Sequence, residues 1–254
     1  MDYFVNKSSI VRKIWGNSDT ILFIFAGSAA EFALNKAVDW LYFTGRLPAD
    51  PLGRLFSTVA YARQIVFSDR AGAYRAIDKM AAIHSKVENN RGAVIPDWAY
   101  RDVLFMLIDY SIRAYELLER KLNEVEKQEV CHVFLQVGQR MGLTGLPGNY
   151  REWVLMREQH LQEDLVYSHF TADLYRQYKK HLGAFRYVIL KQAQLLLVPK
   201  RVSKLLGLGT VSLMQPVVFA YKLSRKLKLD GLVKSSILPT AYKAEIENLD
   251  KIPA

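Results

Sequence analysis

Helix-start signals recur along the chain, and they constrain its fold more than any other feature. Asp50 is followed by Pro51 at the first helical position, Asp69 precedes another segment with helical spacing of apolar residues, and Asn123 stands three residues before Glu126. Such side chains accept hydrogen bonds from the free amides of a first helical turn. We find no run of alternating polar and apolar residues between turn formers, so the sequence predicts no strands.

The apolar periodicity and these caps together predict an all-α protein. Its 254 residues allow one large domain or two small ones, and no linker or repeat divides the chain. We therefore expect a single compact domain over residues 1–254 with about eight to ten helices, a core at about 20–230 and a peripheral tail at 238–254. The segments with helical patterns begin at residue 20 and continue over 29–43, 51–67, 69–88, 98–121, 124–141, 150–167, 171–181, 184–195, 199–206 and 211–229.

The single cysteine and the N-terminal sequence bear on the compartment. Cys131 alone excludes a disulfide framework and a cysteine-based zinc or iron–sulfur site. The N-terminus shows no secretory pattern, so we expect a cytoplasmic protein. The longest stretch without a charge, Leu205–Tyr221, contains Pro216 and is shorter than the roughly 20 apolar residues of a membrane span. We interpret it as a buried helix broken by proline.

The net charge of +10 is concentrated near the C-terminus. Residues 176–234 contain 13 Lys or Arg and one acid, Asp230, so this segment carries +12 and the rest of the chain about −2. Such asymmetry indicates an anionic partner, for example the surface of a membrane, with peripheral contact there. A solvated helix face explains the charge equally well. Nucleic acid is a weaker interpretation, because the nearby aromatic residues follow helical intervals that suit a core.

Two patterns place polar side chains where a ligand could bind. Arg54 and Thr58 are four residues apart and share a helix face, with Ser57 beside them. His84 lies in the next helical segment on an apolar stripe, whose other members are Ile77, Met80, Ala81 and Val87. Spacing alone favours a core histidine held by one hydrogen bond over a ligand to a buried group.

Other metal motifs are incomplete. Glu129 and His132 have the Glu-x-x-His spacing of helical di-iron proteins, which need that motif twice together with two further glutamates. No other histidine has a glutamate three positions before it, so an exposed pair is the better interpretation. A mononuclear site at His160 and Glu163, with His169 nearby, lacks the His-Glu-x-x-His signature of zinc hydrolases.

The block from Asp50 to Thr58, Asp-Pro-Leu-Gly-Arg-Leu-Phe-Ser-Thr, followed by the helical His84 resembles the bacterial rubber oxygenases (latex-clearing proteins) and the related fungal mycophenolic-acid oxygenase. The likeness extends over roughly residues 20–230 through a helical segment at 98–118, a glycine-rich loop at 142–147 and a Pro-Lys-Arg segment at 199–201. The order and spacing of these motifs carry the resemblance more than any motif alone.

This resemblance implies a b-type haem with His84 as the proximal iron ligand. Arg54, Ser57 and Thr58 would lie over the opposite haem face, with Arg54 and Thr58 as the catalytic residues. Ser57 occupies the position of a lysine in the better-studied rubber oxygenases and is too short to act as that lysine would. Residues 28–31 also lack the His-Pro pair that many relatives have early in the chain. We therefore expect this chain to bind haem as the family does. The resemblance does not predict the chemistry on the distal face of the haem or the substrate.

Two functional hypotheses follow. The first is a haem-b-dependent oxygenase-like oxidoreductase that acts with dioxygen on a small, apolar substrate. The second is a non-catalytic helical protein that binds an anionic membrane surface through its basic C-terminal region. The sequence does not indicate the oligomeric state.

Overall fold

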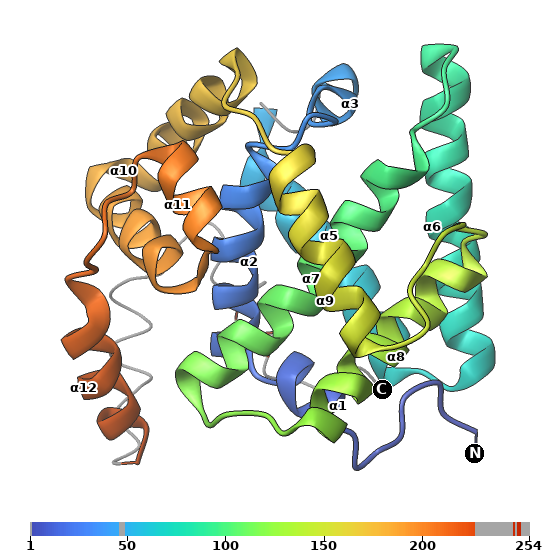
Figure 1. Cartoon of the computed structure of the whole chain (residues 1–254), viewed down its shortest axis with the longest axis horizontal. Helices are drawn as coiled ribbons and strands as arrows, with labels where there is room; N and C mark the ends of the chain where they lie inside the picture. Colours follow the sequence, from blue (N-terminus) through green and yellow to red (C-terminus); the bar gives the residue numbers. More distant parts are fainter. Residues whose placement is uncertain (1, 46–48, 227–245, 247, 250–254) are drawn as a thin grey trace.

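The computed structural model describes residues 2–45, 49–226, 246 and 248–249. Over these residues the chain forms helices and no strand, which confirms the predicted all-α class (Figure 1). The helices are α1 (Ile10–Trp15), α2 (Ser18–Phe32), α3 (Asp39–Phe43), α5 (Pro51–Phe67), α6 (Arg70–Arg91), α7 (Asp97–Leu118), α8 (Glu124–Arg140), α9 (Tyr150–Glu163), α10 (His169–Leu197), α11 (Lys200–Leu206) and α12 (Met214–Lys226).

The long helices surround a central pair, α2 and α7, which make the most extensive helix–helix contact. Helix α5 packs against α6, which lies at the right of Figure 1, and α10 packs against α2 at the left, beside α11 and α12. The largest side chains in the fully buried core include Trp15, Phe105 and Tyr110. The indole nitrogen of Trp15 donates to Ser111 Oγ at 3.1 Å, so α1 is tied to α7 inside the apolar interior.

The predicted caps start the helices that carry the candidate site. Asp50 Oδ1 accepts from the amide of Gly53 at 2.8 Å, and Pro51 begins α5. Asp69 Oδ1 accepts from the amide of Gly72 at 2.6 Å at the start of α6. Local hydrogen bonds thus fix where both helices begin, and with them the positions of the residues along each helix.

The prediction of one helix over residues 29–43 is wrong. Helix α2 runs through Ser28 to Phe32, and the chain turns before α3 begins at Asp39. Asn35 holds this turn, because its side-chain oxygen accepts from the amide of Ala37 at 2.8 Å and its nitrogen donates to Asp102 Oδ2 at 2.6 Å. A buried side-chain amide that is satisfied in this way competes with continued helix.

The segment 205–221 is not a buried helix, and that prediction is also wrong. Helix α11 ends at Leu206 with Gly207 at φ +61°, and Pro216 lies in the first turn of α12, where its missing N–H is tolerated. Val211 and Leu213 are 73% and 77% exposed.

The two helices predicted at 171–181 and 184–195 form one helix, α10, which is kinked at Gly183.

Most of the predicted tail, 238–254, lies outside the described residues, so its division from the core stays a prediction. Within it, Ile246 and Leu249 are buried. The last part of the helix predicted to end at residue 229 also lies outside the described range. Among the helices that the structure describes, none has both the length and the hydrophobicity to cross a membrane.

Candidate functional site

Arg54, Ser57 and Thr58 form one hydrogen-bonded cluster on α5. Arg54 Nη1 donates to Ser57 Oγ at 3.1 Å and to Thr58 Oγ1 at 3.0 Å. Ser57 Oγ donates in turn to the carbonyl oxygen of Arg54 at 2.7 Å. The guanidinium is therefore oriented along the helix by the two hydroxyls that follow it, as the four-residue spacing of Arg54 and Thr58 predicts.

All three side chains line a cavity of about 1290 Å³ whose wall also includes His84. Helices α2, α5, α6, α7, α10 and α12 contribute its mainly apolar walls. Small-molecule sites usually measure about 300–1,000 Å³. The volume of the cavity exceeds this range, and its lining brings together all four residues predicted for the site.

His84 is directed into this cavity from α6 rather than into a closed core. Met80 and Val87, which belong to the same predicted apolar stripe as His84, line the same cavity. Ile77, seven residues before His84, is fully buried. The imidazole meets the ring of Tyr100 edge-on, with centroids 5.3 Å apart. Tyr100 donates through its hydroxyl to Glu88 Oε1 at 3.2 Å.

One nitrogen of the His84 imidazole has no hydrogen-bond partner among the described residues. This nitrogen, Nδ1, is buried. Burial lowers the pKa of His84, the positive charge of Arg54 lowers it further, and Glu88 opposes both. The ring is therefore neutral near pH 7, the form that binds metals. Eight buried side-chain N or O atoms of the described residues lack a partner, and that of His84 is the one that belongs to an imidazole.

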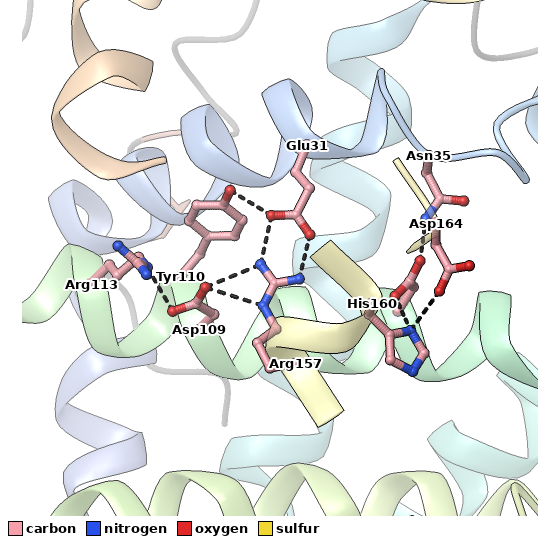
Figure 2. A network of polar contacts seen from close by, with 9 residues as sticks. Glu31, Asn35, Asp109, Tyr110, Arg113, Arg157, His160 and Asp164 are labelled. Carbon is pink, nitrogen blue, oxygen red and sulfur yellow. Dashed lines mark hydrogen bonds and ion pairs between the residues drawn. The ribbon is translucent and has the colours of Figure 1, made fainter. Parts of the chain in front are cut away.

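A second group of polar residues, which the sequence did not reveal, joins α2, α7 and α9 (Figure 2). Arg157 Nη2 contacts Glu31 Oε2 at 2.6 Å and Asp109 Oδ2 at 3.1 Å. Tyr110 donates to Glu31 at 2.8 Å, and Arg113 Nε donates to Asp109 at 2.6 Å. The two arginines balance the two carboxylates, so we interpret this network as structural.

His160 lies in a neighbouring cluster with two carboxylates. Its Nδ1 contacts Asp102 and, at 3.0 Å, Asp164 Oδ2. These three side chains bring possible metal ligands within 4.8 Å of one another. Hydrogen bonds within the chain already satisfy the cluster, because Asn35 also donates to Asp102. The i,i+4 spacing of His160 and Asp164 was the one sequence signal for this pair.

The other predicted alternatives do not gather ligands. Glu163 and His169 do not belong to the group around His160, and His132 is exposed on α8 beside the partly buried Glu129. Cys131 is buried, and burial raises the pKa of its thiol to about 12, so it is protonated and unreactive. Of the constellations weighed in the sequence, only that of Arg54, Thr58 and His84 faces a large cavity.

The helical fold and this site agree with a comparison to family models. The model described as ER-bound oxygenase mpaB/B'/Rubber oxygenase, catalytic domain, matches residues 14–225. The chain therefore belongs to this family of oxygenase catalytic domains, as the resemblance indicated. Searches of curated proteins and of solved structures found no match. Family membership supports an oxygenase-like enzyme that uses dioxygen and an organic substrate.

Proposed function

We propose that the protein binds one b-type haem through His84 and acts as a haem-dependent oxygenase on a small apolar substrate. The observation that carries this proposal is that the neutral imidazole of His84 lines the same cavity as Arg54 and Thr58. A neutral imidazole suits an iron ligand, and apolar walls suit a porphyrin. With one cysteine and no Cys-x-x-Cys-His motif, the haem is held without covalent bonds.

Each polar residue of the site has a role that its contacts support. His84 ligates the iron, and Arg54 keeps its charge inside the cavity, where it pairs with a haem propionate or with negative charge that develops on the substrate. The hydroxyl of Thr58 lines the cavity beside Arg54 and donates to the Arg54 carbonyl oxygen at 3.3 Å, a contact that it would give up to donate to dioxygen. When bound, haem supplies the redox-active iron that activates dioxygen.

Ser57 takes the place of a longer cationic residue and acts on Arg54 instead. Its hydroxyl is engaged by the Arg54 guanidinium and by the Arg54 carbonyl oxygen, at 3.1 Å and 2.7 Å. It therefore holds the guanidinium in the orientation set by α5. The remaining cavity lining is chiefly apolar, which selects against a charged substrate because few polar groups are present to replace its hydration.

The alternative, a non-catalytic protein that binds an anionic membrane, is favoured by exposed apolar side chains on α10 and α12 and by exposed basic side chains on α10. Haem content separates the two proposals. A pyridine haemochrome assay on protein produced with adequate haem supply is expected to give one b-type haem per chain and a Soret band. Colourless protein that also fails to take up added haemin would leave only the non-catalytic alternative.

A further inference from the structure

Exposed apolar side chains gather on α10, on the segment that leads into α12 and on α12 itself. Leu213 and Phe219 are 77% and 73% exposed, although both are large and apolar. Exposed apolar residues that stand singly are normal, whereas a group of them marks an interaction surface. We call this group the apolar strip, and its members are Phe185, Val188, Val211, Leu213, Val217 and Phe219.

Hydrogen bonds attach the part of the apolar strip at Leu213 to α10. The amide of Leu213 donates to Gln192 Oε1 at 2.8 Å, and Ser212 Oγ donates to the Gln192 carbonyl oxygen at 3.0 Å. Gln192 follows Val188 by four residues and Phe185 by seven, so all three share one face of α10. The segment before α12 is therefore attached beside the exposed side chains of α10, at the left of Figure 1.

The other end of α12 is anchored to the central helices. Tyr221 donates to Asp19 Oδ2 at 2.8 Å, and Lys222 Nζ donates to the carbonyl oxygen of Leu117 at 3.3 Å. Helix α12 thus lies against the body of the protein while Val217 and Phe219 stay exposed. An amphipathic helix held in this way needs no refolding to contact the interface of a membrane.

The surface around the apolar strip is basic. Residues 174–229 contain no Asp or Glu. Arg176 is paired with Asp173 at 2.9 Å, whereas Lys179, Lys180, Lys200 and Lys204 are exposed. Apolar side chains surrounded by Lys and Arg match a bilayer with anionic headgroups. The apolar side chains enter the interface, and the basic side chains approach the charges of the lipid headgroups.

The cavity reaches the surface at the same place. Val217, which is 49% exposed, lines the cavity together with Arg186 from α10 and Met214 from α12. The lining also comes to the surface at Phe43 and Ile83, where acidic and basic side chains are mixed, for example Asp39 and Arg91. The cavity wall formed by α10 and α12 thus reaches an apolar and basic part of the surface.

We propose that the apolar strip docks on an anionic lipid bilayer and that apolar molecules dissolved in the bilayer enter the cavity between α10 and α12. Docking is independent of any cofactor. The entry of substrate rests on the proposed oxygenase function and places the substrate among lipids or molecules that partition into them. A substrate of this kind reaches the cavity without crossing water.

Docking is tested by co-sedimentation of the full chain with phosphatidylcholine vesicles and with vesicles that also contain phosphatidylglycerol. We expect binding to the anionic vesicles that falls as salt is raised, because headgroup charges are screened. The double variant Leu213→Asp/Phe219→Asp is expected to lose about tenfold or more in affinity, and Lys200→Gln/Lys204→Gln a similar amount.

Control variants on other surfaces distinguish the effect of the position from the effect of the change in charge. Val125→Asp introduces the same acid at a 78% exposed valine on α8, and Lys121→Gln removes an exposed lysine at another surface; both are expected to bind as wild type. Binding that is equal on neutral and anionic vesicles and unaffected by salt would overturn docking. So would equal losses in the control and strip variants, or binding only to a protein partner and to no vesicle.

Entry is tested by transfer of an uncharged, fluorescently labelled long-chain hydrocarbon from vesicles to the protein. Met214→Trp adds bulk to the cavity lining between α10 and α12 without changing a member of the apolar strip. It is expected to abolish most of the fast transfer while vesicle binding and haem content stay unchanged. Unchanged transfer would overturn entry at this place. Because docking and transfer are read without turnover, a failure of the oxygenase proposal remains distinguishable from a failure of this one.

Discussion

At the scale of single residues, His84 is an ionisable group at which burial and the charge of Arg54 outweigh the opposing charge of Glu88. Its pKa lies below the ordinary value of 6.5, through burial first and the charge of Arg54 second. Protonation therefore favours the unfolded chain. The contribution of His84 to stability is complete above about pH 6.5 and is lost as the pH falls from there through the lowered folded-state pKa.

This sign gives a testable difference in the haem-free protein. Between about pH 7.5 and 5, the free energy of unfolding of wild type is expected to fall more than that of His84→Asn, because the variant has no imidazole to titrate. Urea unfolding at each pH measures both. His132→Asn, at an exposed position of α8, is expected to retain the wild-type slope. Equal slopes for His84→Asn and wild type would show that His84 is not buried as described.

Arg157 belongs to the same scale, since one side chain neutralises two carboxylates. Arg157→Leu leaves Glu31 and Asp109 buried with less compensation, and we expect a loss of about 3–5 kcal/mol in the free energy of unfolding. Arg151→Leu, on an exposed position of the same helix, is expected to change it by less than about 0.5 kcal/mol. Similar unfolding midpoints for the two variants in urea would contradict a structural role for the network around Arg157.

At the scale of helices, the contact between α2 and α7 depends on the absence of a side chain at Gly27. A Cβ there would overlap the ring of Tyr110, which the surrounding core holds in place. A Cβ at Gly138 would instead meet the end of the flexible Leu104 side chain, at 2.8 Å. Both are glycines inside helices, so Gly→Ala brings the same gain of about 1 kcal/mol in helix propensity.

Gly27→Ala is therefore expected to destabilise the protein by about 1–3 kcal/mol, whereas Gly138→Ala is expected to be neutral or slightly stabilising. Thermal or urea unfolding of the two variants measures the difference. A Gly27→Ala protein as stable as Gly138→Ala would contradict the close approach of α2 to the ring of Tyr110.

The helices that could be predicted from the sequence are those with local signals. The Asp50 and Asp69 caps act within three residues, so they set the starts of α5 and α6 correctly. The end of α2 could not be predicted, because Asn35 is held by Asp102, 67 residues away. Likewise, Arg157 and Glu31 are 126 residues apart, and no spacing in the sequence connects them.

The candidate site was within reach of the sequence for the same reason. Arg54, Ser57 and Thr58 lie within two turns of one helix, and His84 lies on the helix that follows and packs against it. The resemblance to a family then suggested what they bind. The exposure of Leu213 and Phe219 was not predicted, because an apolar helix on a surface and one in a core have similar composition.

At the scale of the whole molecule, one cavity joins two regions with different proposed tasks. Its wall at α5 and α6 carries Arg54, Thr58 and His84, and its wall at α10 and α12 borders the apolar strip. In Figure 1, α6 lies to the right of the central pair, α2 and α7, whereas α10 and α12 lie to its left. An apolar substrate that enters beside α12 would reach the proposed haem through the interior of the protein.

The most direct test of this account is a spectroscopic titration of haem-free protein with haemin. Wild type and His132→Gly are expected to bind one equivalent with the same Soret spectrum. His84→Gly is expected to lose most of its affinity and to recover binding when imidazole is added, because the free ring replaces the missing ligand. The two variants carry the same cost of glycine in a helix. Binding by His84→Gly that equals wild type, in affinity and spectrum and without imidazole, would contradict the assignment of His84 as the iron ligand.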